Sequence, residues 1–404
     1  MSEVAQAPHS SPDGHSPQLR FPEFSGNWEE VPFYDCLNDI LDFRGRTPLK
    51  IGMDWGGGNI ISLSANNVKN GYIDFNAECH LGSGELYEKW MGKVKLVKND
   101  IVFTMEAPLG KALLVPDDKR YILSQRVVAF KTKDYIDNLY FIQLIWSNKF
   151  QNTVDRLSTG STAKGINQKS LKKVFVNIPL KPEQQKIAAF LTAVDTKIEQ
   201  LSKKKALLGE YKKGLMQQIF SQAIRFKADD GSDFPDWKEK KLGDILDYEQ
   251  PTNYIVDSTE YDNSFDMPVL TAGKSFVLGY TNETHKVFEN IPVIIFDDFT
   301  TANKYVDFPF KVKSSAMKIL KPKDSFVNIR LIFEFIQMLN FPIGEHKRYW
   351  ISEYQDLKIP FPSFEEQTKI ASFLSSIDNK IEQVGKQLDE SKQFKKALLQ
   401  QMFV

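Results

Sequence analysis

The sequence predicts an α+β protein in which two mixed α/β domains are separated by two long helices, and these helices pair as an antiparallel coiled coil with pseudo-twofold symmetry. Two observations support this prediction. The 38-residue segment 183–220 recurs at 366–403 without a gap, and 19 of its positions are identical. The sequence before each copy is rich in short β-type runs separated by turn residues. The predicted order is therefore domain, helix, domain, helix.

The repeat sets the expected boundaries. We expect a flexible tail at 1–18, a first domain at 19–178, a first long helix at 179–222, a second domain at 223–358 and a second long helix at 359–404. Strands are predicted at 59–63, 93–97, 101–105, 112–115 and 121–131 in the first domain, and at 268–271, 275–280, 293–296 and 316–320 in the second. A helix is predicted near the end of each domain, at 139–150 and at 330–339.

A weaker second repeat precedes each domain. Residues 19–30 resemble residues 224–239, and both segments run from an aromatic-proline turn to a tryptophan that an acidic residue follows. The whole chain therefore reads as two tandem units of similar outline.

The two long helices carry a narrow apolar stripe. Apolar residues recur at alternating steps of three and four, which is the spacing of a coiled-coil seam. The seam residues are Ile187, Leu191, Val194, Ile198 and Leu201 in the first copy and Ile370, Leu374, Ile377, Ile381 and Val384 in the second. Polar residues interrupt this stripe at Lys205 and Lys212 in the first copy and at Ser391 and Lys395 in the second. The alternative is two separate amphipathic helices, each lying on its own domain.

Composition narrows the class of protein. Of 404 residues, 42% are hydrophobic, no apolar stretch is long enough to cross a bilayer, and the first residues lack the pattern of a secretory signal, so we expect a cytoplasmic protein. The two cysteines cannot form a disulfide framework. Basic and acidic side chains number 52 each, but residues 28–182 carry 21 basic and 17 acidic ones, whereas 237–365 carry 15 and 19. Nucleic-acid binding would therefore depend on local basic surface.

Several motifs together resemble one known family. Each long helix follows an Ile-Pro turn, at Ile178 and Ile359, and begins with the pattern EQxKIAxFLxxxDxKIEQ. The GRTP sequence at 45–48 and the Gly-rich loop at 160–171 also fit. The chain resembles the specificity (S) subunit of type I restriction-modification enzymes over nearly its whole length. The GRTP sequence has no clean counterpart in the second domain, where Gln250-Pro251-Thr252 takes its approximate place.

The resemblance implies a fold and a function. In that family two target-recognition domains alternate with helices that pair as an antiparallel coiled coil, each domain reads one half of a split site in double-stranded DNA, and the coiled coil sets the spacer. The S subunit is not catalytic and binds no cofactor. Two modification subunits methylate adenine with S-adenosylmethionine, and restriction subunits of the complex use ATP and Mg²⁺.

Candidate DNA contacts follow from side-chain chemistry, since Arg pairs with guanine and Asn with adenine in the major groove, and hydroxyls, amides and lysines contact phosphates. In the first domain they are Arg44, Arg46, Lys50, Asn66, Asn67, Lys69, Ser161, Thr162, Lys164, Asn167 and Gln168. In the second they are Thr271, Lys274, His346, Lys347, Arg348 and Tyr349, with Trp350 expected in the core. For each of these residues, a solvated polar loop is the alternative.

Two other functions are compatible with parts of the sequence. A protein–protein adaptor with two variable domains would have the same repeat. A fused restriction-modification enzyme is disfavoured, because neither an adenine-methylase motif nor a nucleophile-base arrangement stands out. Asp297-Asp298 could hold a metal ion, but we expect a surface turn there.

Overall fold

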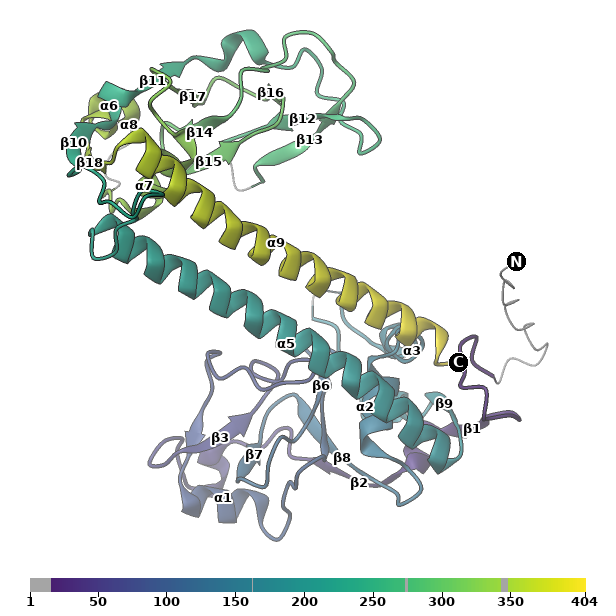
Figure 1. Cartoon of the computed structure of the whole chain (residues 1–404). Helices are drawn as coiled ribbons and strands as arrows, with labels where there is room; N and C mark the ends of the chain where they lie inside the picture. The colour runs from purple at the N-terminus through teal and green to yellow at the C-terminus, as the bar shows by residue number, and fades with distance from the viewer. Residues whose placement is uncertain (1–15, 162, 273–274, 343–347) are drawn as a thin grey trace. The chain divides into compact units, whose positions relative to one another are not determined.

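The structure is a computed structural model, which describes residues 16–161, 163–272, 275–342 and 348–404. The chain divides into two compact units (Figure 1). Unit 1 comprises Met1–Ser202 with Lys386–Val404, and unit 2 comprises Lys203–Gly385. The long helices α5 (Lys181–Phe220) and α9 (Phe364–Gln401) each contribute one part to each unit.

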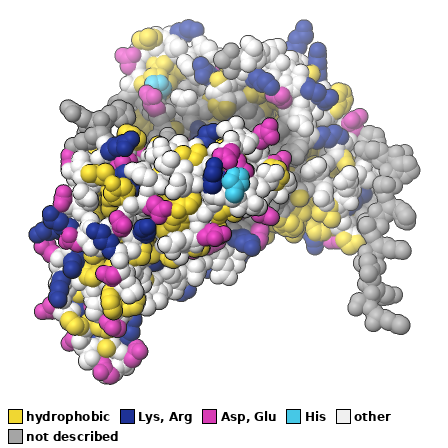
Figure 2. All heavy atoms as spheres, turned by 90° about the horizontal axis from the view of Figure 1, so that it is seen from above, with side chains coloured by type: hydrophobic (Ala, Val, Ile, Leu, Met, Phe, Trp, Pro, Cys, Tyr) yellow, Lys and Arg dark blue, Asp and Glu magenta, His cyan; other side chains and the backbone are white. Residues whose placement is uncertain are grey.

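Basic and acidic side chains are mixed on the surface. On the face drawn in Figure 2, Lys and Arg side chains are interspersed with Asp and Glu, and small hydrophobic patches lie between them. Among the described helices, none has the length and apolar character needed to cross a membrane.

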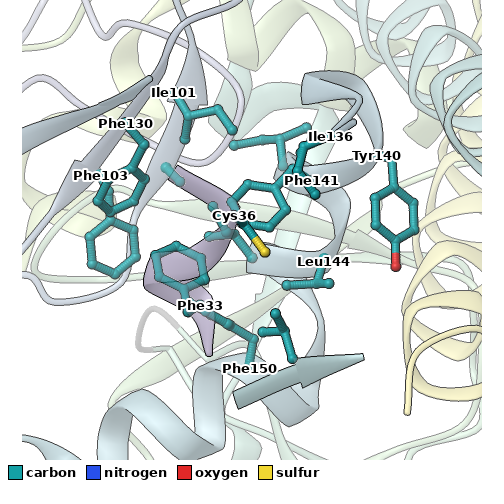
Figure 3. Close-up of a cluster of buried hydrophobic side chains, with 14 of the residues drawn as sticks. Phe33, Cys36, Ile101, Phe103, Phe130, Ile136, Tyr140, Phe141, Leu144 and Phe150 are labelled. Carbon is teal, nitrogen blue, oxygen red and sulfur yellow. The ribbon is translucent and has the colours of Figure 1, made fainter. Parts of the chain in front are cut away.

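A four-stranded antiparallel sheet forms the centre of unit 1. Its order is β2 (Leu37–Asp42), β8 (Val127–Thr132), β5 (Ile101–Thr104) and β6 (Ala112–Leu114). Both faces of β5 and β8 are buried, which explains their nearly continuous apolar sequences. On one face, helices α2 (Asn138–Trp146) and α3 (Asn148–Leu157) pack against the sheet, and Figure 3 shows the aromatic rings that fill this layer.

The other face of that sheet packs against a smaller layer. There β4 (Leu81–Gly82), β3 (Ile60–Leu63) and β7 (Tyr121–Leu123) form a three-stranded sheet in which β3 and β7 are parallel. Helix α1 (Gly84–Met91) contributes buried side chains to the same core. The first strand, β1 (Glu29–Pro32), pairs antiparallel with β9 (Phe175–Ile178). Strand β9 follows α4 (Gln168–Leu171) and leads into α5.

Unit 2 has the same strand orders as unit 1. Its four-stranded sheet runs β11 (Leu246–Glu249), β17 (Met317–Pro322), β14 (Val293–Asp297) and β15 (Asn303–Val306). Its three-stranded sheet runs β13 (Val277–Thr281), β12 (Met267–Leu270) and β16 (Lys311–Val312), with β12 and β16 parallel. Strands β10 (Lys238–Lys241) and β18 (Lys358–Phe361) pair, and α6 (Leu242–Ile245), α7 (Ile329–Met338) and α8 (Tyr349–Ser352) complete the unit.

The same set of contacts, which we call the joint, attaches the first turn of each long helix to the unit in which that helix begins. The first-turn residue Glu183 has a buried carboxylate that accepts hydrogen bonds from Arg20 at 2.8 Å and from the Trp28 indole at 3.2 Å. In unit 2, the equivalent Glu366 accepts them from Arg225 and from Trp237, the latter at 2.7 Å. The weaker repeat at 19–30 and 224–239 therefore supplies the arginine and tryptophan of each joint.

Both long helices contribute to the core of each unit. In unit 1, Leu191 of α5 and Leu398 of α9 belong to one buried cluster. In unit 2, Ile219 of α5 and Leu374 of α9 do so. Among the predicted seam residues, Ile187, Leu191 and Leu201 of α5 and Ile370, Leu374, Ile377 and Val384 of α9 are buried, whereas Val194, Ile198 and Ile381 are partly exposed.

Three element predictions are corrected. Residues 93–97 form no strand, because Val94 and Leu96 anchor an extended connection between α1 and β5. The predicted strand 121–131 is two strands, interrupted at Arg126, whose φ of 65° is incompatible with a strand. The predicted helix at 139–150 ends at Trp146 because Ser147 is extended and caps α3 through its hydroxyl.

Candidate nucleic-acid interface

One end of the four-stranded sheet of unit 1 gathers loops from distant parts of the chain. Asp42 at the end of β2 is opposite Val128, and Thr104 at the end of β5 is opposite Val127. The loops after β2 and β5 and before β8 therefore leave the sheet at the same end, which is where loops of a rigid scaffold carry function.

The Asp42 carboxylate brings two predicted residues together. Arg44 donates to it through Nε at 2.9 Å and Nη2 at 2.5 Å, and Gln168 donates through Nε2 at 2.8 Å. Partial burial alone raises the pKa of Asp42, but the hydrogen bonds from Arg44 and Gln168 outweigh it and hold that pKa below its ordinary value. The ionised carboxylate therefore orients a partly exposed guanidinium and a carboxamide at the edge of the sheet.

The loop that begins at Ser158 is held beside this cluster. Ile166 donates its backbone N–H to Met105 O at 2.8 Å, and Thr159 and Gly165 exchange two backbone hydrogen bonds. Gly160 has a φ of +99°, and a Cβ there would lie 2.4 Å from the Ala163 carbonyl oxygen, so only glycine fits this turn.

The remaining predicted residues of this loop have varied surroundings. Lys164 is exposed and pairs with Asp155 at 2.6 Å, Ser161 is exposed, and Thr162 lies outside the described residues. Asn167 caps α4 by accepting from Ser170 N–H at 2.8 Å.

Arg126 belongs to the same surface, although its sequence context did not predict this. Its exposed side chain lies 3.9 Å from Glu106, and its carbonyl accepts from Met105 N–H. Nothing in the local sequence marks this residue, since it reaches the surface only through the pairing of β8 with β5. We call Arg44, Arg126, Lys164 and Gln168 the loop-end group.

The other predicted residues of the first domain lie apart from Asp42. Arg46 donates to Trp90 O at 2.7 Å and covers the Phe43 ring, and exposed Lys50 donates to Gly45 O. Lys69 donates to the carbonyl of exposed Asn66 at 2.7 Å.

Asn67 is corrected. Its side chain is fully buried, accepts from Ser64 N–H at 2.9 Å and donates to Ser62 O at 2.9 Å. It shapes the loop after β3 and is not exposed to a ligand.

The predicted residues of the second domain divide similarly. Arg348 is exposed at the start of α8, and Thr271 donates its backbone N–H to Phe276 O at 2.9 Å. Tyr349 is corrected, because it is 1% exposed and packs against Phe341. Lys274, His346 and Lys347 lie outside the described residues. Trp350 lies in the core, as expected.

Two acidic groups in unit 2 have the composition of metal ligands. Asp297 ends β14 and Asp298 begins the expected turn, in which Phe299 and Thr300 are exposed. The two aspartates themselves are buried: the Asp297 carboxylate accepts from Phe299 N–H, and the Asp298 carboxylate lies 3.4 Å from the buried Lys318 ammonium. Asp257, Glu283 and His285 lie close enough to share an ion, but the ammonium groups of Lys286 and Lys311 already contact the two carboxylates at 2.9 and 2.7 Å. Lysine contacts at this distance neutralise the negative charge that a cation needs.

The profile of the family described as "Type I restriction modification DNA specificity domain" matches residues 27–209 and 235–391, which is most of the chain. The chain belongs to this family. The predicted resemblance to type I specificity subunits is confirmed.

Individual relatives agree with this assignment. The EcoR124I/EcoR124II specificity subunit of Escherichia coli is 49% identical over 141 residues, which are 34% of this chain and 35% of that subunit. The putative MjaX specificity subunit of Methanocaldococcus jannaschii is 23% identical over 427 residues, 93% of each chain. The crystal structure of a type I S subunit from M. genitalium is 19% identical, covers 96% of this chain and 99% of its own, and has a TM-score of 0.63, a likeness that establishes the fold.

Proposed function

We propose that this specificity-family chain is the DNA sequence-recognition subunit of a type I restriction-modification complex. Each mixed α/β domain reads one half of a bipartite site, and the chain itself is not catalytic. The observation that carries the proposal is the family match to both halves of the chain, combined with the identical strand orders of the two units. A duplicated reader matches a recognition site made of two half-sites.

Reciprocal contacts support pairing of the long helices as an antiparallel coiled coil with pseudo-twofold symmetry. Asp195 of α5 pairs with Lys395 of α9 at 2.5 Å within unit 1. Within unit 2, Asp378 of α9 pairs with Lys212 of α5 at 2.8 Å. Each residue of the first pair has its equivalent in the second, 183 positions away. When residue i contacts j′ and i′ contacts j, the two elements are related by a twofold operation.

The coiled coil would set the spacer between the half-sites. The 40 residues of α5 make a helix about 60 Å long, equivalent to roughly 18 base pairs. The loop-end group of unit 1 and Arg348 of unit 2 are the side chains proposed to approach DNA. Near-zero net charge favours DNA binding that depends on partner subunits.

The partners follow from the same assignment. Two modification subunits would bind the chain and methylate adenine with S-adenosylmethionine, and restriction subunits would join with ATP and Mg²⁺, so the cofactors belong to other subunits. One related solved structure, which is 16% identical, is described as showing the structural basis of complex assembly in a type I restriction-modification system.

Adenine-methylation mapping across the source genome, with and without this gene, tests the proposal. Loss of methylation at one bipartite motif on deletion supports it and gives both half-sites at once. Unchanged methylation in a strain that expresses the chain and its modification subunit contradicts the proposal and favours a protein–protein adaptor.

A further inference from the structure

Two polar interruptions of the helical seam, Lys212 and Lys395, contact a recognition domain. In unit 1, the Lys395 ammonium of α9 lies 2.5 Å from Asp195 of α5 and 4.5 Å from the centre of the Trp146 ring of α2. Asp195 also accepts from Gln143 of α2 at 2.9 Å. One lysine thus joins α9, α5 and the helix of the first domain.

Unit 2 repeats the arrangement with the helices exchanged. Lys212 of α5 donates to Asp378 of α9 at 2.9 Å and to Glu334 of α7 at 2.9 Å. Arg330 of α7 donates to both carboxylates. Glu334 lies five residues after the start of α7, as Gln143 does in α2. We call these two sets of residues the lysine junctions.

The lysine junctions are poorly suited to stabilising the chain. Within the part of the chain that the structure describes, the oxygen of Gln143 and the Nε atom of Arg330 are buried there without a hydrogen-bond partner. An apolar residue in place of each lysine would complete the seam, and well-packed apolar replacements of buried ion pairs are often neutral or stabilising. Polar groups at such positions have their best-attested role in fixing register and geometry.

From these contacts we infer that Lys212 and Lys395 are positioning residues, which fix the orientation of each recognition domain on the helix pair and thereby the spacer length that the complex accepts. This inference rests on the proposed function. Because an ammonium must approach its carboxylate and the domain helix at once, a small rotation of α2 or α7 breaks its contacts. An apolar side chain tolerates such a rotation, since dispersion contacts have no direction.

The two junctions differ in strength. In unit 2, Arg330 still bridges Glu334 and Asp378 when Lys212 is removed. In unit 1, among the described residues, the Asp195 carboxylate keeps the neutral Gln143 as its side-chain partner when Lys395 is removed. Lys395→Met is therefore expected to relax the spacer more than Lys212→Met does.

The test measures methylation by the full chain assembled with the methyltransferase subunit from the same genome. The substrates are a library of DNA duplexes in which the two half-sites are separated by every spacer within three base pairs of the natural one. Wild type is expected to prefer one spacer by at least about tenfold. Lys395→Met should reduce that preference at least about threefold while keeping both half-site sequences, and Lys395→Arg should restore it.

The outcomes separate the inference from the proposed function. If Lys395 has only a structural role, Lys395→Met lowers methylation on all spacers by the same factor, and that result overturns the inference. An unchanged spacer preference in the Lys212→Met/Lys395→Met double variant also overturns it. If the wild-type assembly methylates no bipartite site, the proposed function itself fails. Lys197→Met, an exposed substitution two residues from Asp195, is the matched control and should change nothing.

Discussion

Removal of Arg225 gives a quantitative test of the joint between α9 and unit 2. The Glu366 carboxylate is fully buried and accepts from Arg225 at 3.1 Å and 2.9 Å. Arg225→Met leaves it with the Trp237 indole and the positive end of α9 as its remaining polar partners. Breaking a buried ion pair from one side costs about 3–5 kcal/mol. Because two favourable contacts remain and Arg225 is itself 26% exposed, we expect about 2–3 kcal/mol.

Glu366→Gln removes the charge and one of the three hydrogen bonds. The amide keeps the size of the side chain, and its oxygen can still accept from Trp237 and from Arg225 Nη2, but its NH2 group cannot accept from Arg225 Nε. We therefore expect a cost of about 1–2 kcal/mol. The predicted order is therefore Arg225→Met above Glu366→Gln.

Hydrogen exchange followed by mass spectrometry measures these costs locally. A loss of about 2–3 kcal/mol corresponds to exchange about 30- to 150-fold faster in the first turns of α9. Arg20→Met is the matched control, because it should produce the same effect at the start of α5 and none in the first turns of α9. Acceleration below about fivefold at α9 in Arg225→Met, or a larger effect in Glu366→Gln, would refute the reasoning.

Three further predictions concern the loops of the two units. Asn67→Ala should destabilise unit 1 by about 1–3 kcal/mol in denaturant unfolding, because it removes the hydrogen bonds to Ser64 N–H and Ser62 O. Asn66→Ala, at the exposed neighbouring position, is the control and should be neutral; equal costs of the two variants would contradict the assignment. Gly160→Ala should weaken DNA binding by the assembled complex without shifting global unfolding, because it strains the loop beside the loop-end group. An unchanged affinity would show that this loop does not contribute to DNA binding. Hydrogen bonds from His285 and then Lys286 lower the pKa of Asp257 to about 2. The contribution of these contacts to the stability of unit 2 is therefore complete above about pH 4 and is lost as the pH falls toward 2. A midpoint near 3.8 for this carboxyl in an NMR titration would contradict the prediction.

Sequence reasoning succeeds where a pattern is local. Short runs bounded by turns correctly identify β3, β5, β6, β12, β13, β14 and β17. In β5 and β14, burial on both faces selects apolar and β-branched residues within a few positions. It fails at 93–97, where buried Leu96 fixes an extended connection that no neighbouring strand pairs with. Periodicity cannot distinguish these cases, because hydrogen-bond partners come from elsewhere in the chain.

The candidate interface depends even more on tertiary structure. Asn66 and Asn67 are adjacent and chemically identical, yet one is exposed and the other is fully buried. Arg126 joins Arg44 only because β8 pairs with both β2 and β5. The residue types predicted for DNA contact were chosen by chemistry alone, and chemistry alone does not specify which side of a loop faces outward.

The distribution of identities within the helical repeat shows which contacts constrain it. Of the first 18 aligned positions 12 are identical, against 7 of the last 20. The first part contains the joint with the domain. There Gln184 accepts from the N–H of Asp137, the N-cap of α2, and Gln367 accepts from the N–H of Asn328, the N-cap of α7. Such hydrogen bonds require one side chain at one position.

The seam beyond the joint requires only an apolar residue of suitable size, as the pair Leu201 and Val384 illustrates. The strongest constraint on the repeat is therefore the attachment of domain to helix, and the loops at the far end of each sheet are free of it. A domain with different loops can occupy the same joint provided that the N-cap residue of the helix equivalent to α2 and α7 donates its backbone N–H to the glutamine. This separation allows the two units to share strand orders and a joint while their exposed loops, the proposed DNA-reading surfaces, differ in sequence.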